Sequence, residues 1–456
     1  MERLKDQFFG RRRLLQEITE GVLANQPASF SLVGTKYVGK SHILNHLLAP
    51  QGPLQGDEFA AWRPMRFQEP GSVIALLIDC DWHDAQQDLM SYLYQRLRSH
   101  IEIEERISLD WARVDSQSGN TRKIWQIARQ LNQMDYRLIV LMDNFDRAFE
   151  NQLIHLESSD ELRPLTLELA LIVATEQPLH DLDRELAASP LFNVMTQLFV
   201  GLLEIDAAER WLDAYCMRFP AVAEVKELLL TLTGTHPYLL RRIDDILEEI
   251  QQFMAPGQGL SQNYAELIRL RLAEHGRLLF VTLWQKLQKP PVRIPTGSVH
   301  RLLQEMSTDD SSAAQIEPNQ FATLNWLINQ AIVSFGDGSY HLFSPLFADF
   351  IATRQRSDAL SPTPISIPGS SSAAPIYNRL TKTERALLSY FENHSGAVVP
   401  AQQLLSEVWH RPDASPRRVQ EAIRRLRLQL EEANPPVGVI ENERGLGYRF
   451  IPATVG

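Results

Sequence analysis

The stretch from Phe30 to Leu48 constrains the fold most, because it joins a short apolar run to a helical pattern through a loop with glycines at both ends. The loop reads Gly34-Thr-Lys-Tyr-Val-Gly39-Lys40-Ser41, which is G-x-x-x-x-G-K-S. Glycine allows backbone conformations and close approaches that a Cβ would forbid, so successive N–H groups can turn toward one phosphate. This pattern between a buried strand and a helix predicts a loop that binds nucleotide phosphates.

Several side chains of this loop have an expected contact with a bound nucleotide. Lys40 supplies a mobile cation for the β- and γ-phosphates, Ser41 offers a hydroxyl to Mg²⁺, and the positive end of the following helix adds to the anion site. The alternative is a strand–helix turn that binds nothing. We predict ATP and Mg²⁺ as ligands, with nucleotide contacts from Gly34, Thr35, Lys36, Tyr37, Val38, Gly39, Lys40, Ser41 and His42.

Three further buried strands are predicted, at Ser72–Asp79, at Leu167–Thr175 and, with the most information about the site, at Arg137-Leu-Ile-Val-Leu-Met-Asp143. Five apolar residues in a row suit a parallel strand covered on both faces, and its acidic carboxyl end is where ligands of open α/β sheets bind. Asp143 is therefore predicted to hold Mg²⁺, usually through water. Asn144 follows and can position a water but cannot take its proton at neutral pH. We expect ATP binding with slow hydrolysis at most, unless Asp146 or another acid substitutes.

Size and composition predict a cytoplasmic protein of about three domains. The 456 residues are 44% hydrophobic and 22% charged, as in soluble globular proteins. No apolar run is long enough to span a bilayer, so no membrane partner is expected. The charged N-terminus lacks the apolar core of a signal peptide. Only two cysteines, Cys80 and Cys216, are present, which fits a reducing compartment.

Composition shifts predict where the domains begin and end. At Gly234-Thr-His236-Pro237, glycine ends one element and proline starts the next, which predicts a rigid corner. Residues 265–354 suggest a winged helix without a row of basic residues, so we expect them to pack onto the preceding domain. Residues rich in Ser and Pro then predict an extended, mobile linker. The predicted domains are 1–250, an α/β domain with a parallel sheet, flanking helices and a helical lid, then 265–354, the linker 355–376, and 377–453.

The last domain places arginines on the open faces of an amphipathic helix. Val419, Ile423, Leu426 and Leu430 are spaced for one buried face. The hairpin predicted at 439–450 has a glycine-bearing tip next to Arg444. From residue 377 onward there are 11 Lys and Arg against 9 Asp and Glu, a net charge of +2 in a chain whose total is −11. The arginines left for the other faces of the helix are Arg417, Arg418, Arg424, Arg425 and Arg427.

Several of these motifs together resemble a STAND-type, AAA-related P-loop ATPase over roughly residues 7–350. They are Gly10-Arg11, the phosphate loop, Met142-Asp143-Asn144-Phe-Asp146, Ser189-Pro-Leu-Phe-Asn193 and the Gly-x-His-Pro corner. The resemblance implies that Arg11 and His236 contact the nucleotide, although a helix-capping histidine is the alternative. Two departures, Asn144 in place of an acid and Thr175-Glu176 where relatives carry arginine, put hydrolysis rather than binding in doubt.

Residues 377–453 resemble an OmpR/PhoB-type winged helix-turn-helix. The Ile-Arg-Arg-Leu-Arg run and the Arg-Gly-x-Gly-Tyr-Arg hairpin carry this resemblance. It implies that the third helix enters the major groove of duplex DNA while the hairpin reaches the minor groove or backbone. Solvated arginines, or a fold used for protein contacts, are the alternatives. The implied DNA contacts are Arg417, Arg418, Gln420, Arg424, Arg425, Arg427 and Arg444.

The whole sequence predicts an ATP-binding, nucleotide-switched protein that binds double-stranded DNA as a transcriptional regulator. Homo-oligomerisation through the ATPase domain would place several DNA-binding domains side by side, and flexible linkage would then increase avidity. One alternative is a signalling or defence switch whose winged helices bind a protein partner. Another is an ATP-driven loader or remodeller of DNA, against which Asn144 argues.

Overall fold

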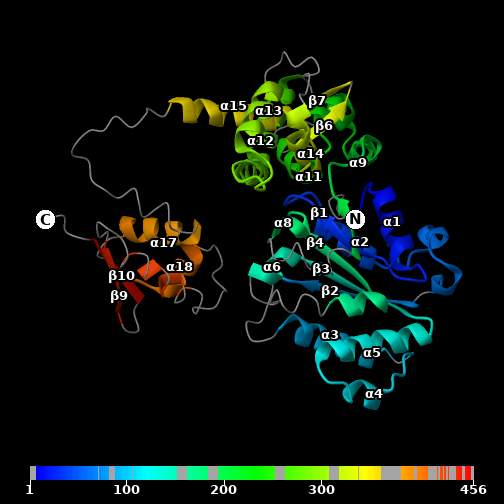
Figure 1. The fold of residues 1–456 in the computed structure, drawn as a ribbon. Helices are drawn as coiled ribbons and strands as arrows, with labels where there is room; N and C mark the ends of the chain where they lie inside the picture. Colours follow the sequence, from blue (N-terminus) through cyan, green and yellow to red (C-terminus); the bar gives the residue numbers. More distant parts are fainter. Residues whose placement is uncertain are drawn as a thin grey trace. The chain divides into compact units, whose positions relative to one another are not determined.

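In a computed structural model the chain forms two compact units, residues 1–360 and 361–456, and each is described by itself (Figure 1). The structure describes residues 7–69, 71–81, 88–104, 106–150, 162–182, 194–251, 262–307, 318–336, 338–360, 382–394, 398–408, 419, 422–424, 426–427, 430, 438–443 and 447–452.

The first unit contains a five-stranded sheet in which all strands are parallel. Its order is β2-β3-β4-β1-β5. β1, β3 and β4 are buried along their whole length, as expected for strands covered on both faces. The sequence therefore predicted the parallel α/β fold correctly. The strands are β1 (Ser29–Val33), β2 (Val73–Asp79), β3 (Arg137–Asp143), β4 (Ala170–Thr175) and β5 (Met195–Phe199).

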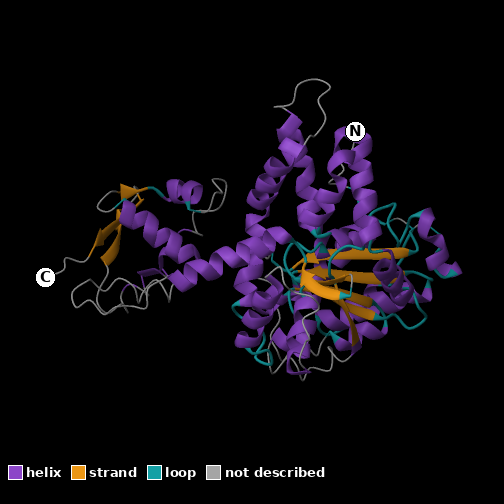
Figure 2. Ribbon diagram, turned by 90° about the horizontal axis from the view of Figure 1, so that it is seen from above, coloured by secondary structure: helices purple, strands orange, loops and turns teal. Residues whose placement is uncertain are grey.

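Helices cover both faces of this sheet (Figure 2). Side chains of β3 contribute to the core on each face. Leu138, Val140 and Met142 pack into one core, while Ile139 and Leu141 pack into the other, because successive side chains point to opposite faces. The flanking helices are α1 (Arg12–Val22), α2 (Lys40–Leu48), η2 (Asp57–Trp62), η3 (Met65–Phe67), α3 (Leu89–Ile103), α4 (Trp111–Asp115), α5 (Asn120–Gln133), α6 (Phe145–Glu150), η4 (Arg163–Leu167) and α8 (Leu179–Leu182).

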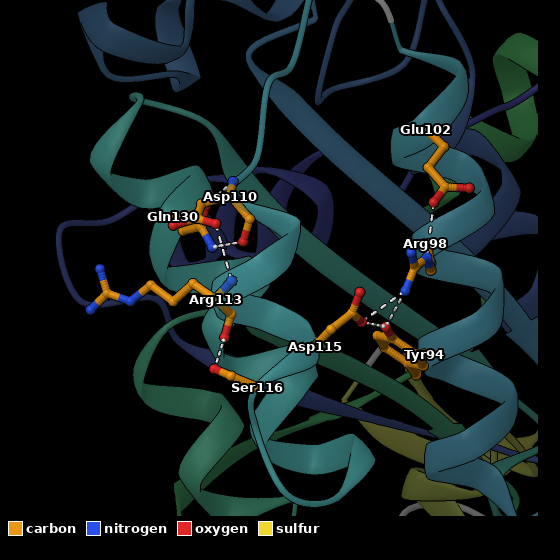
Figure 3. Close-up of polar contacts among 8 residues, drawn as sticks. All are labelled: Tyr94, Arg98, Glu102, Asp110, Arg113, Asp115, Ser116 and Gln130. Carbon is orange, nitrogen blue, oxygen red and sulfur yellow. Dashed lines mark hydrogen bonds and ion pairs between the residues drawn. The ribbon is translucent and has the colours of Figure 1, made fainter.

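Polar contacts attach the short helix α4 to α3 and to α5 (Figure 3). Arg98 on α3 donates to Asp115 at 2.9 Å and to the Tyr94 hydroxyl at 2.8 Å. The side chain of Asp110 caps α4 by accepting from the Arg113 N–H, and its own N–H donates to Gln130 on α5 at 2.7 Å. These bonds satisfy the ends of a helix too short to be stable alone, so we assign them a structural role.

The remaining helices of the first unit, which we call the helical body (residues 205–360), share one apolar core. The predicted lid and the predicted winged-helix-like region both contribute to it. Gly234 ends α10 with φ +54, and Ser344 donates to the Leu232 carbonyl at 2.6 Å. The elements are α9 (Ile205–Arg218), η7 (Pro220–Val225), α10 (Lys226–Thr233), α11 (Pro237–Gln251), α12 (Gln262–Leu287), α13 (Thr296–Ser307), η8 (Pro318–Gln320), α14 (Phe321–Asn329), β6 (Val333–Gly336), β7 (Ser339–Leu342) and α15 (Pro345–Leu360).

The second unit has an antiparallel sheet of order β8-β10-β9 packed against helices. Val419, Ile423, Leu426 and Leu430 are all buried, which confirms the predicted buried face. Most of the predicted linker, residues 361–376, lies outside the described residues. Among the helices that the structure describes, none is long and apolar enough to cross a bilayer. The elements are α17 (Lys382–Asn393), β8 (Val398–Val399), α18 (Ala401–Glu407), β9 (Gly438–Glu443) and β10 (Gly447–Pro452).

Candidate functional site

The phosphate loop connects β1 directly to α2 and depends on its glycines. Gly39 caps α2 with φ +104, a conformation that residues with a Cβ rarely adopt. A Cβ on Gly34 would lie 2.8 Å from both the Val200 carbonyl oxygen and a Val38 methyl group. The two glycines are thus required by a left-handed turn and by a close approach, respectively.

Lys40 is buried and folded back onto its own loop. Its Nζ donates to the carbonyl oxygens of Gly34 at 2.7 Å and Thr35 at 3.1 Å. Burial lowers the pKa of Lys40, while the nearby carboxylates, Glu176 first, oppose that shift. A cation held only by carbonyl oxygens can exchange them for phosphate oxygens, which would form stronger, charge-assisted hydrogen bonds.

The carboxyl ends of β1 and β3 bring the phosphate loop and Asp143 to the same edge of the sheet. Asp143 is buried and accepts from the Asn144 N–H at 3.0 Å. No group of three or more His, Cys, Asp and Glu side chains within the described ranges could hold a metal ion. The Ser41 hydroxyl and the Asp143 carboxylate are oxygen ligands of the kind Mg²⁺ prefers, and phosphates and water usually complete such a site.

A cavity of about 660 Å³ lies between this edge and the helical body. Its volume suits a nucleotide. Asn144 and Glu176 line it together with the phosphate loop, and aromatic side chains also contribute to its lining. The remaining lining residues are Gln7, Phe8, Phe9, Arg11, His42, Ile43, Leu203, Trp211, Pro237, Tyr238, Arg241, Arg242 and Asp245.

Arg11 ties the N-terminal segment to the phosphate loop. Its guanidinium donates to the carbonyl oxygens of Leu202 at 2.8 Å, Gly201 at 2.5 Å and Val38 at 3.3 Å. Burial lowers its pKa to about 10, against the opposing effect of Glu204. Arg11 also lines the cavity, so the structure places it at the predicted site. Its hydrogen bonds in this structure stabilise the position of the loop.

His236 is completely buried and caps α11. Its Nδ1 accepts from the Tyr238 N–H at 3.2 Å, and its ring centroid lies 5.2 Å from that of Phe343. Burial lowers its pKa to about 3, and nearby Arg11 lowers it further. Pro237 and Tyr238 line the cavity but His236 does not. In this conformation it has the capping role, and its contact with nucleotide stays a prediction.

Polar contacts join the helical body to the phosphate loop and to Glu176, directly after β4. The sequence did not indicate these contacts. Lys286 on α12 donates to the carbonyl oxygen of Glu176 at 2.5 Å, and the Glu176 side chain pairs with Lys36 at 3.3 Å. Thr35 in the loop donates to the Gln330 carbonyl oxygen at 3.3 Å. These partners are far apart in sequence, and no local pattern could have paired them.

The structure describes only two of the seven predicted DNA contacts. Arg424 is exposed on the third helix of the second unit. Arg427 is half-buried, and its Nε donates to the Ile440 carbonyl oxygen at 2.8 Å, which joins this helix to β9. Outside the described residues lie Arg417, Arg418, Gln420, Arg425 and Arg444, and also the Ser189–Asn193 motif.

Comparison with known families confirms the resemblance of the second unit. Residues 377–450 match the Trans_reg_C family, described as "Transcriptional regulatory protein, C terminal". This segment is therefore a domain of the OmpR/PhoB type. No curated protein matches the chain significantly. The STAND subtype of the first unit stays a prediction.

Solved structures of ATPases and replication proteins are similar to the chain at low scores. The Walker-type ATPase PABY2304 of Pyrococcus abyssi is 17% identical, covering 76% of this chain and 96% of its own, with a TM-score of 0.44. The Aeropyrum pernix ORC2 protein, in ADPNP–ADP complexes, is 12% identical over 78% and 99%, with a TM-score of 0.42. Because such scores do not establish a common fold, the fold assignment depends on the strand order and the loop geometry.

Proposed function

We propose that the chain is an ATP-responsive DNA-binding protein that acts as a transcriptional regulator. The observation that carries the proposal is the cavity at the carboxyl edge of the sheet, where Lys40, Asp143 and the helical body converge. The same chain carries a domain that matches the C-terminal domain of transcriptional regulatory proteins. Nucleotide would bind in the cavity, and the winged helix would bind duplex DNA.

The polar side chains at and beside the cavity support the binding of ATP with Mg²⁺. Lys40 would leave the carbonyl oxygens of its loop and contact the β- and γ-phosphates. The Ser41 hydroxyl and the Asp143 carboxylate would hold Mg²⁺, directly or through water. When bound, this ion neutralises phosphate charge and fixes the phosphates in one geometry.

The aromatic side chains that line the cavity support the binding of the base. Phe9 stacks on Trp211 with ring centroids 5.0 Å apart, and Arg242 lies 4.9 Å over the ring of Tyr238. Flat aromatic and guanidinium surfaces stack favourably on a purine. Because Trp211 and Tyr238 belong to the helical body, a bound nucleotide would contact both sides of the cavity.

Contacts across the cavity edge support a switch between nucleotide states. Lys286 and Gln330 join the helical body to Glu176 and Thr35, and Arg293 pairs with Asp181 at 2.9 Å. A ligand shifts a conformational equilibrium only when it binds the two states with different affinity. Phosphates that draw Lys40 and its loop away from these contacts would favour a different position of the helical body. Such a movement, repeated in a homo-oligomer, would change how the winged helices are presented.

The experiment is duplex binding by the full chain, measured as fluorescence anisotropy on DNA from upstream of its own gene. Affinity would be compared with ATP, with ADP and without nucleotide. Lys40→Ala removes the phosphate contact, and Arg424→Ala/Arg425→Ala removes the predicted DNA contact. Arg385→Ala, at an exposed position on α17 of the same unit, is the matched control.

We expect nucleotide-dependent, salt-sensitive binding. Lys40→Ala should abolish the dependence on nucleotide, Arg424→Ala/Arg425→Ala should weaken the binding, and the control should behave as the wild type. Absence of salt-sensitive binding in every nucleotide state would refute the proposal and favour a protein-interaction switch. Rapid ATP turnover stimulated by DNA would instead favour a loader or remodeller.

A further inference from the structure

Asn144, which follows the predicted magnesium ligand, is held by a carboxylate on the neighbouring strand. Its side-chain Nδ2 donates to Oδ1 of Asp79 at 2.9 Å. Asp79 is the last residue of β2 and lies beside Asp143 in the register of β2 and β3. Asn144 lines the nucleotide cavity and has a left-handed backbone with φ +51. The hydrogen bond therefore joins the ends of two neighbouring strands at the cavity.

The charge of Asp79 decides which way the Asn144 amide faces. An amide carries one acceptor and one donor group of nearly equal shape, so a hydroxyl partner could accept either orientation. An ionised carboxylate only accepts, so it selects the orientation with Nδ2 toward β2. Oδ1 is then left on the side away from Asp79. The Asp81 N–H also donates to Asp79 Oδ1, at 3.0 Å, which fixes the carboxylate itself.

We propose that Asp79 is the positioning residue for hydrolysis: it holds Asn144 so that Oδ1 accepts a hydrogen bond from the water that attacks the γ-phosphate. The inference rests on the proposed binding of ATP. The water oxygen forms a bond to the γ-phosphorus, and the bond from that phosphorus to the bridging oxygen breaks. The electron pair of that bond leaves on ADP. Because an amide cannot take a proton, the water proton passes to a γ-phosphoryl oxygen, and the products are ADP and dihydrogen phosphate.

With this arrangement, a site without a carboxylate at position 144 would still support a slow reaction. The amide orients the water, but the acceleration that a general base supplies, on the order of a hundredfold or more, is absent. The carboxylate is present one strand away, at Asp79, with its charge used to orient the amide. A site with a general base would have the carboxylate at position 144, facing the cavity. Here position 144 carries the amide of Asn144, and the carboxylate is at position 79 on the neighbouring strand.

The two side chains can be exchanged, and the exchange is the test. Asp79→Asn removes the carboxylate that selects the orientation of the Asn144 amide. Asn144→Asp places two carboxylates within hydrogen-bonding distance. The double variant Asp79→Asn/Asn144→Asp restores an amide–carboxylate pair, now with the acid facing the cavity. Two carboxylates so close cannot both ionise freely. Asp81→Asn is the matched control, since the hydrogen bond from Asp81 to Asp79 comes from the backbone N–H, which the substitution keeps. Single-turnover hydrolysis and binding of a fluorescent ATP analogue would be measured on each full-length variant.

Asp79→Asn should slow hydrolysis about threefold to tenfold without weakening ATP binding, the loss expected for one oriented hydrogen bond. The exchanged double variant should exceed the wild type by up to about a hundredfold, as a restored general base would supply. It should also be several times faster than Asn144→Asp alone. Equal rates for the double variant and for Asn144→Asp, with ATP still bound, would overturn the inference. Failure of the wild type to bind ATP would instead refute the proposed function.

Asp146 offers a different proton acceptor, and the same assay separates it. Burial raises the pKa of Asp146, and Glu176 raises it further. If Asp146→Asn abolished hydrolysis while Asp79→Asn left the rate unchanged, the acceptor would be Asp146 and Asp79 would have no part in the reaction. A faster rate of hydrolysis in Asp79→Asn/Asn144→Asp can be measured even if the wild-type rate is close to the detection limit.

Discussion

Replacing Lys286 by methionine tests whether the helical body is docked on the sheet at the carboxyl ends of its strands, beside the phosphate loop. Methionine keeps most of the apolar volume of the lysine but removes the charge and the hydrogen bond to Glu176. Burial lowers the pKa of Lys286 from 10.5 to about 8, although Glu176 opposes that shift and Lys40 adds to it. An undocked helix would leave this lysine in water with its ordinary pKa.

The lowered pKa makes the free energy of unfolding depend on pH. Between pH 8 and pH 10.5 the unfolded chain binds more protons at Lys286 than the folded chain does, so the contribution of this group to stability rises with pH. From pH 7 to pH 9 the gain amounts to about 1 kcal/mol. Lys286→Met lacks this gain, so its stability relative to the wild type should fall by about the same amount over that interval.

Urea unfolding at pH 7 and pH 9, followed by tryptophan fluorescence, measures this difference, because Trp211 and Trp284 belong to the helical body. Lys289→Met, at an exposed position three residues further along the chain, is the matched control and should follow the wild type. The same pH dependence in the wild type and in Lys286→Met would refute the docking of this lysine against Glu176.

Four further outcomes are expected. Gly39→Ala should cost about 1–2 kcal/mol through its left-handed backbone and abolish ATP binding, as followed by thermal unfolding and calorimetry. Phe450→Ala should cost about 3–5 kcal/mol in the DNA-binding domain, where the side chain is buried, and should remove DNA binding while ATP binding persists. Arg424→Ala/Arg425→Ala should reduce the salt dependence of DNA binding by about two phosphate contacts, seen in a plot of log affinity against log salt. Removal of Mg²⁺ by EDTA should weaken ATP binding in the wild type, and Asp143→Asn should make that binding insensitive to EDTA.

The sequence was sufficient for the parts of the site that short segments encode. The loop from Gly34 to Ser41 and the end of β3 at Asp143 are local patterns, and parallel strands place both at one edge of the sheet. The buried face of the third helix in the second unit followed from its spacing alone. The places of the loop and the strand end, and the buried face, could be predicted because each depends on residues that are neighbours in the chain.

One strand boundary was wrong for a local reason. The strand expected from Leu167 begins only at Ala170, because residues 163–167 form the 3₁₀ helix η4 and Leu167 is 75% exposed. Apolar residues occur in both segments, so hydrophobicity alone could not separate the 3₁₀ helix from the strand.

Contacts between distant segments could not be predicted from the sequence. Lys286 and Glu176 are 110 positions apart, and Thr35 and Gln330 are 295 apart. A lysine on a long helix is usually solvated, so nothing in its neighbourhood marks it as buried. The pairing of Asp79 with Asn144 depends on the register of two strands, which the sequence does not state.

If nucleotide binding and DNA binding are coupled, the affinities for the two ligands must depend on each other. If ATP changes the affinity of the full chain for duplex DNA by some factor, DNA must change its affinity for ATP by the same factor. The dissociation constant of a fluorescent ATP analogue would therefore be measured with and without saturating duplex. We expect saturating duplex to change this dissociation constant by the same factor by which ATP changes the DNA affinity. Identical ATP affinity in both conditions, with both ligands bound, would contradict the proposed coupling.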